Sequence, residues 1–353
     1  MNTYTRYDSD LTDSLCAFLD RVSFSDFYQA MQGRVIGQPE LVHVCANVYH
    51  YLDCLANGRP VHGNMLLAAP SGSGKTETYR ALHAYFEKEL PMIPVAIFDV
   101  TQLSPVGFRG ANKDEMLSQL FLASQAGQTR HPAMIYFLDE LDKKLSPSYD
   151  GNGKNVNADV QGDLLTVLEG GNVTANRGPT VCTDRVLFVG LGSFDAFRTK
   201  REEKERTTGF LSDPEDDKRD VFEPLEREHM LEVGASHELL GRFPYIINYG
   251  KLTRDAVRSV IVKNVRALSA NYYCSIEVSP SFVERLMESA NGAYGCRTIE
   301  NELQQSALLA YEKYLLSGGE EKGGVWKMYL SSPTEASITY TKGELNEQPV
   351  EMH

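Results

Sequence analysis

The stretch Met65-Leu-Leu-Ala-Ala-Pro-Ser-Gly-Ser-Gly-Lys-Thr76 decides the fold class of this chain. The apolar run Met65–Ala69 is typical of a short buried strand, and the residues from Glu77 to Leu90 are typical of a helix. Between them, Gly72 and Gly74 allow the backbone to turn its N–H groups inward, toward an anion. A strand, a glycine-rich turn, a Lys-Thr pair and a helix together predict a phosphate-binding loop.

Each residue of this loop has an expected part in holding ATP with Mg²⁺. Lys75 is expected to reach the β- and γ-phosphates, and the Thr76 hydroxyl is expected to ligate Mg²⁺. Ala69 replaces the first glycine of the pattern, a change that costs about 1 kcal/mol if the position needs a positive φ. The expected ATP-binding residues of the loop are Pro70, Ser71, Gly72, Ser73, Gly74, Lys75, Thr76 and Glu77.

A second apolar run, Met134–Leu138, ends in the adjacent carboxylates Asp139 and Glu140. Asp139, at the strand tip, can hold Mg²⁺ through water, and Glu140 can polarise the attacking water. Further short apolar runs at residues 95–100 and 186–189 are spaced like the buried parallel strands of an α/β domain. The two motifs together predict a P-loop nucleoside triphosphatase with a parallel sheet covered by helices on both faces.

The composition and charge of the chain exclude several classes of protein and of binding partner. The formal charge of −13 argues against a protein that coats nucleic acid. The polar start, MNTYTRYDSD, predicts no signal peptide, and no apolar run is long enough to span a bilayer, so we expect a cytoplasmic protein without membrane partners. The six cysteines lie far apart and the eight histidines show no metal-ligand spacing, so the sequence predicts reduced thiols and no zinc site.

A chain of 353 residues is long enough for about two domains. We expect a helical extension over residues 1–30 and a large ATPase domain over residues 31–249. The apolar pattern then becomes mainly helical, which predicts a small lid domain over residues 250–331. The polar residues 332–353 are expected to form a disordered tail.

With these motifs in place, the sequence resembles the AAA+ ATPases of the ClpX/HslU unfoldase branch, from about Arg34 to Leu316. Val35-Ile-Gly-Gln38 is similar to the family element whose apolar pair, here Val35 and Ile36, packs against adenine. Gly241-Arg-Phe-Pro244 is similar to the family's Gly-Arg-Leu-Pro. The resemblance implies that Arg242 is an arginine finger, which reaches ATP bound on the adjacent subunit.

The family's sensor-2 segment, which contacts the nucleotide, has an altered counterpart here. Gly292-Ala-Tyr-Gly-Cys-Arg297 resembles it, but Tyr294 stands where the family has an arginine. Tyrosine supplies no fixed positive charge, so we expect Arg297, one helical turn later, to cover part of the role.

Two further resemblances concern polypeptide substrates. Gly107, Phe108, Arg109 and Gly110 align with the family's Gly-Tyr-Val-Gly pore loop, in which an aromatic side chain grips a passing chain. Asp159–Asp163 lies where the family has a second pore loop before a helix.

A third resemblance concerns the partner peptidase. Thr208, Gly209 and Phe210 lie in a charged stretch where ClpX carries an aliphatic-Gly-Phe tripeptide that docks on ClpP. A chance Gly-Phe pair in a solvated loop remains an alternative for this segment.

The resemblance implies a homo-hexameric ring that hydrolyses Mg-ATP between subunits, threads unfolded polypeptide through its pore and has a ClpP-type peptidase as candidate partner. The zinc-binding domain that precedes the ATPase in ClpX is missing from this sequence. This absence, with Thr208, leaves open a stand-alone remodeller of protein complexes or nucleic acid. Ala69 and Tyr294 leave open a scaffold that binds nucleotide and hydrolyses it weakly.

Overall fold

The structure is a computed structural model that describes residues 3–103, 113–124, 129, 131–175, 178–195, 197, 222–290, 295–316 and 325–341. Two compact units divide the chain. The first comprises Met1–Pro70 and Gly74–Gly250, and the second comprises Lys251–His353 together with Ser71–Ser73. No helix among these residues has the length and apolar character needed to cross a bilayer.

The first unit is built on a five-stranded sheet with the strand order β2-β3-β6-β1-β7, in which every pair is parallel. The strands are β1 (Met65–Ala68), β2 (Val95–Asp99), β3 (Met134–Asp139), β6 (Val186–Gly192) and β7 (Tyr245–Asn248). All residues of β1 and β6 are buried, because helices cover both faces of the sheet. The parallel sheet and its α/β class confirm the fold predicted from the sequence.

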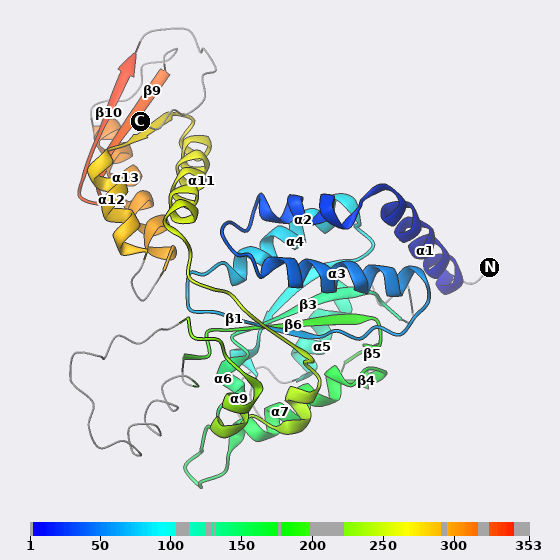
Figure 1. The fold of residues 1–353 in the computed structure, drawn as a ribbon. Helices are drawn as coiled ribbons and strands as arrows, with labels where there is room; N and C mark the ends of the chain where they lie inside the picture. The colour runs from blue at the N-terminus through cyan, green and yellow to red at the C-terminus, as the bar shows by residue number, and fades with distance from the viewer. Residues whose placement is uncertain are drawn as a thin grey trace. The chain divides into compact units, whose positions relative to one another are not determined.

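Helices cover the sheet in two layers (Figure 1). On one face, Leu67 and Phe137 pack in a core shared with α1 (Thr3–Arg21), α2 (Phe24–Gln32), α3 (Leu41–Ala56) and α4 (Lys75–Glu89). On the other face, Leu66 and Tyr136 share a core with α5 (Lys113–Ala123), α6 (Asp142–Leu145), α7 (Val156–Leu168), α9 (Arg227–Val233) and α10 (His237–Gly241). Neighbouring residues of one strand face opposite cores because side chains alternate along a strand.

Short elements connect these layers. The single turn η1 (Val100–Gln102) follows β2, and the hairpin of β4 (Asn172–Thr174) and β5 (Thr180–Cys182) precedes β6. The N-terminal extension is helical, as its apolar spacing predicts. It packs on the sheet domain through Leu15 and Phe18, which are fully buried in the same core as Leu67.

The second unit contains α11 (Arg254–Tyr272), α12 (Pro280–Ser289), α13 (Arg297–Leu316) and a three-stranded sheet with the order β10-β9-β8. Its strands are β8 (Ser275–Val278), β9 (Val325–Ser332) and β10 (Glu335–Thr341). The sequence predicted a disordered tail from residue 332, and this is wrong for β10. Ala336 is buried and Ile338 packs against the same core, so alternate residues of this mostly polar strand are anchored.

Candidate functional site

The glycine-rich loop between β1 and α4 has the backbone that its sequence predicts. Gly72 and Gly74 have φ values of 77° and 99°, in the left-handed region that favours glycine. Ala69 is not among the residues with positive φ, and its N–H donates to Gly192 O at 3.2 Å as an extension of strand β1. The backbone penalty expected for the missing first glycine therefore does not arise.

Lys75 is the first residue of α4, and its side chain folds back over the loop. Its ammonium donates to Pro70 O at 3.0 Å and also to Ala69 O. Burial lowers the pKa of this amine to about 8, and four carboxylates oppose the shift: Asp142, Asp195, Glu140 and Asp139. A positive charge is thus held at the carboxyl edge of the sheet, where parallel α/β folds bind ligands.

The predicted acid pair ends strand β3 at the same edge. Asp139 is the last residue of the strand, and its Oδ1 accepts from the Glu140 N–H at 3.0 Å. Glu140 has φ 54°, a conformation that side-chain-bearing residues adopt at a cost and that clusters at functional sites. Burial raises the pKa of both carboxyl groups, and the negative charge of Asp142 raises that of Glu140 further.

Asp142 is a residue that the sequence reasoning missed. It is only 2% exposed, and its Oδ2 accepts from the Phe194 N–H at 3.1 Å and from the Ser193 hydroxyl at 3.3 Å. Its Oδ1 has no hydrogen-bond partner within the described residues. A Cβ at Gly192 would come within 2.8 Å of that same oxygen, so glycine is required where β6 passes Asp142. An acid three residues after Asp139, directly after a buried strand, is the signal that could have found it.

The predicted adenine-contacting residues lie beside the loop. Val35 is buried, and its Cγ1 is 3.8 Å from the position of a Cβ at Gly74. Ile36 is partly exposed next to it. Gln38 is buried as well, and its side-chain amide donates to Gly250 O at 3.0 Å. This segment is therefore fixed between the glycine-rich loop and the end of the first unit.

Arg242 lies apart from Lys75, Asp139 and Glu140. It follows α10 and forms a half-exposed ion pair with Glu169, at 2.8 Å. Within the described residues, its guanidinium makes no hydrogen bond or ion pair with Lys75, Asp139 or Glu140. Arg297 begins α13 in the second unit, where it is exposed.

Several predicted residues cannot be placed. Gly107, Phe108, Arg109, Gly110, Thr208, Gly209, Phe210 and Tyr294 lie outside the described residues. The second pore loop expected at residues 159–163 is described, and it lies inside helix α7 rather than in a loop.

Comparison with known proteins agrees with this geometry. Residues 61–246 match the family described as "AAA domain (Cdc48 subfamily)". The chain is 25% identical over 276 residues to an ATP-dependent Clp protease ATP-binding subunit ClpX of Porphyromonas gingivalis, covering 69% of this chain and 65% of that protein. It is 30% identical over 223 residues to ClpX 2 of Wolinella succinogenes, covering 59% of this chain and 53% of that protein.

A third relative, ClpX of Bacteroides fragilis, is 25% identical over 312 residues, covering 78% of this chain and 73% of that protein. The first relative is matched over slightly less than two thirds of its own length. The family match lies on the central sheet and includes the glycine-rich loop and the acid pair. Because this match covers more than half of the chain, the protein belongs to the AAA family of ATPases, and it is similar to ClpX.

Proposed function

We propose that this ATPase assembles into a ring, hydrolyses Mg-ATP at the contacts between subunits and uses the energy to pull polypeptide through the central pore. The observation that carries the catalytic part is the convergence of Lys75 with Asp139 and Glu140 at one edge of the sheet. Phosphoryl transfer to water needs a lysine that binds the phosphates and carboxylates that hold Mg²⁺ and the water. Here the lysine begins the helix after β1, and the carboxylates lie at the end of β3.

The residues present fit both phosphates and a magnesium ion. The left-handed backbone at Gly72 and Gly74 turns N–H groups toward an anion, and Lys75 adds positive charge. Oxygen donors for a hard cation come from Thr76, Asp139 and the unpartnered Oδ1 of Asp142. Mg²⁺, when bound, neutralises charge on the phosphate oxygens.

Glu140 is the group that we assign to the attacking water. Its carboxylate lies in a partly buried place beside Asp142, which makes it a stronger proton acceptor than a free glutamate. Its backbone has φ 54°, and its N–H is held by the Asp139 carboxylate at 3.0 Å. Glu140 would orient the water and accept its proton as the terminal phosphate is transferred.

Arg242 supports catalysis between subunits. Its partner Glu169 and Arg242 itself are both about half exposed, and such surface ion pairs contribute about 0–1 kcal/mol. The guanidinium can therefore leave Glu169 at little cost to reach a triphosphate on a neighbouring copy. An arginine supplied in this way commonly raises the hydrolysis rate by about 10³–10⁵-fold.

Action on polypeptide is proposed from the sequence and from the similarity to ClpX. Phe108 between two glycines would grip a threaded chain, and Thr208-Gly-Phe210 would dock on a ClpP-type peptidase. Thr208 places a hydroxyl where an aliphatic side chain is expected, and this favours a second candidate, a remodeller that acts without a peptidase. Protein degradation measured with and without added ClpP separates the two candidates.

The test of the catalytic assignment is Glu140→Gln, which keeps the size of the side chain and removes its proton acceptor. We expect ATP to bind normally and its turnover to fall by about 10²-fold or more. Glu87→Gln, on the exposed face of α4, is the matched control and should hydrolyse ATP at the parental rate. An undiminished rate in Glu140→Gln would refute the assignment.

The test of threading is Phe108→Ala. We expect ATP hydrolysis to continue and the unfolding of a tagged substrate protein to be lost. Unfolding at the parental rate would show that Phe108 does not grip the substrate.

A further inference from the structure

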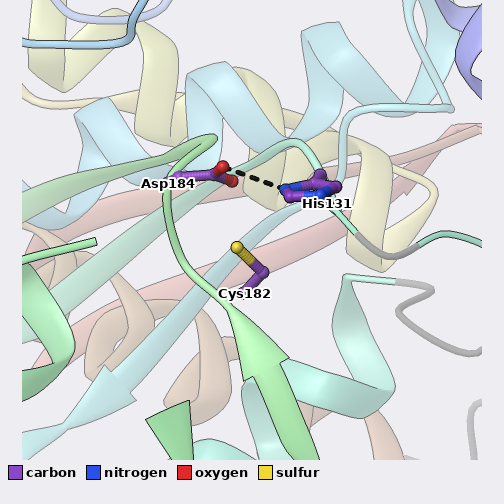
Figure 2. Close-up of side chains that lie close together, drawn as sticks. All are labelled: His131, Cys182 and Asp184. Carbon is purple, nitrogen blue, oxygen red and sulfur yellow. Dashed lines mark hydrogen bonds and ion pairs between the residues drawn. The ribbon is translucent and has the colours of Figure 1, made fainter. Parts of the chain in front are cut away.

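Three metal-binding side chains meet in the first unit, away from the nucleotide site. His131, Cys182 and Asp184 each place one ligand atom within 4.8 Å of the other two. Figure 2 shows the Cys182 sulfur directed toward the other two side chains, with His131 Nδ1 and Asp184 Oδ2 at 2.9 Å. The sequence showed no such spacing, because 50 residues lie between His131 and Cys182.

The sheet topology brings the three residues together. His131 lies just before β3, and Cys182 and Asp184 lie just before β6. These strands are parallel neighbours with Met134 opposite Val186, so their preceding loops meet at the amino edge of the sheet. Asp139 ends β3 at the other edge, and six strand residues span about 20 Å. The cluster is thus separate from the ATP site.

The backbone of the two loops is held in place by Tyr51 of α3. This buried hydroxyl accepts from the Met134 N–H at 2.9 Å and donates to Arg185 O at 2.9 Å, so one side chain joins both loops. Between the two ligands of the second loop, Thr183 is also buried, and its hydroxyl donates to Val167 O at 2.9 Å. A site whose supporting backbone is fixed in advance loses little entropy on binding.

Two of the three side chains are exposed enough to rotate toward a metal ion. Cys182 is only 4% exposed and defines the floor of the site, whereas the side chains of His131 and Asp184 are 46% and 43% exposed. Ligands of a tetrahedral zinc ion lie about 3.5 Å from one another. Rotation of the His131 and Asp184 side chains can bring the three ligand atoms, now within 4.8 Å of one another, to that distance. Solvent has access to the position of a fourth ligand.

We propose that His131, Cys182 and Asp184 bind one Zn²⁺ ion, with water as the fourth ligand. Thiolate, imidazole and carboxylate are the ligand types that zinc takes from proteins, and three protein ligands with an open position is a common zinc geometry. As the Zn–S bond forms, the Cys182 thiol releases its proton to the buffer. The imidazole nitrogen and the carboxylate oxygen each donate an electron pair. The bound ion would link the loop before β3 to the loop before β6.

The test uses Co²⁺ as a spectroscopic substitute for Zn²⁺ on the full chain, freed of metal and of any affinity tag. We expect thiolate-to-cobalt charge-transfer absorption that saturates at one equivalent and disappears when Zn²⁺ is added. Cys182→Ser should abolish this absorption. Cys54→Ser is the matched control, because Cys54 Sγ also lies near a histidine, 3.5 Å from His50 Nε2, but in no such three-donor group among the described residues.

His131→Gln and Asp184→Asn, on the exposed side of the site, should each weaken Co²⁺ binding by about tenfold or more while leaving the fold intact. Circular dichroism confirms that each variant is folded. In thermal denaturation, Zn²⁺ should raise the melting temperature of the parent protein and of Cys54→Ser, and leave Cys182→Ser unchanged. Absorption that persists in folded Cys182→Ser, or a folded parent that shows none, would overturn the proposal.

Discussion

At the scale of single residues, the carboxyl edge of the central sheet holds two charged side chains that are partly or fully removed from water. Lys75 is a partly buried ammonium with a lowered pKa, and Asp142 is a buried carboxylate with one unpartnered oxygen and with the Lys143 ammonium 3.2 Å from the other. A charge removed from water costs stability to the extent that hydrogen bonds and opposite charges do not offset its lost hydration, and a bound ligand of opposite charge adds to that offset. Activity and stability are therefore expected to respond in opposite directions to substitutions at this edge.

Lys75→Met removes the partly buried positive charge. Without nucleotide we expect the variant to be more stable than the parent by about 1–3 kcal/mol at pH 7, because a pKa lowered from 10.5 to about 8 reflects a cost of that order. The folded state releases this proton more readily than the unfolded chain, so parental stability rises between pH 8 and 10.5. The advantage of the variant is then complete below pH 8 and lost as the pH nears 10.5.

Urea denaturation across this pH range measures the effect, and Lys88→Met, which lies on the exposed surface of α4, serves as the control. The variant should also fail to bind ATP. A variant that is less stable than the parent at pH 7 would contradict the charge argument.

Asp142→Asn tests the buried carboxylate. The amide oxygen can still accept from the Phe194 N–H, and the buried negative charge is gone together with its ion pair to the half-exposed Lys143, which contributes about 0–1 kcal/mol. We expect an unchanged or higher melting temperature together with a clear fall in the ATP turnover rate, since the variant lacks an oxygen donor for Mg²⁺. Equal loss of stability and turnover would instead indicate a purely structural residue.

At the scale of helices and strands, one side chain joins elements that are far apart in the sequence. Tyr51 of α3 hydrogen-bonds to the backbone at the start of β3 and just before β6, which are adjacent strands in the sheet. Backbone groups at buried strand ends need such partners, because an unpaired buried group costs about 1–3 kcal/mol. The Tyr51 hydroxyl therefore stabilises the ends of two sheet strands, although Tyr51 itself lies in a helix.

Tyr51→Phe leaves the Met134 N–H and the Arg185 carbonyl without this partner. We expect the first unit to lose about 1–3 kcal/mol in its free energy of unfolding. Tyr49→Phe removes a hydroxyl that donates to Val22 O nearer the surface and should cost less. Guanidinium denaturation of both variants gives the comparison, and equal costs would count against the special role of Tyr51.

The elements differ in how well the sequence predicted them. The strands β1, β2, β3 and β6 were predicted because strands buried on both faces appear as short continuous apolar runs. β10 was missed because its inward residues, Ala336 and Ile338, are small or isolated among polar neighbours. β7 was also missed, since Tyr245 is exposed and the strand is short.

The residues of the candidate sites were also predicted only where a local sequence pattern indicates them. Lys75, Asp139 and Glu140 were predicted because each adjoins a strand end within a recognisable local pattern. Asp142 became a candidate only through its hydrogen bonds with Ser193 and Phe194, which directly follow β6. His131 and Cys182 meet through strand pairing, which no spacing along the chain expresses.

At the scale of the whole molecule, the proposed ring makes each active site a shared one. Lys75 and Glu140 would come from one subunit and Arg242 from the next. This division is consistent with the place of Arg242, whose guanidinium pairs with Glu169 and, within the described residues, makes no hydrogen bond or ion pair with Lys75 or Glu140. The residues of one subunit alone would not be sufficient for ATP hydrolysis.

Mixing two inactive variants tests this division. Lys75→Met subunits keep Arg242, and Arg242→Ala subunits keep Lys75, so mixed rings contain some complete sites. We expect each variant alone to show little ATP hydrolysis and the mixture to regain a measurable fraction of it. Mixtures of Lys75→Met with Glu140→Gln, whose lesions fall on the same side of the site, are the control. No recovery in the first mixture would argue for sites completed within one chain.

Helix α3 connects the carboxyl edge of the central sheet with its amino edge. The segment that ends at Gln38 lies against the glycine-rich loop, and the helix that follows carries Tyr51 to the opposite edge of the sheet. A helix of 16 residues is about 24 Å long and is stiff along its axis. We therefore expect a displacement of α3 at its amino-terminal end to reach the backbone at Met134 and Arg185, beside the loops that hold His131 and Asp184.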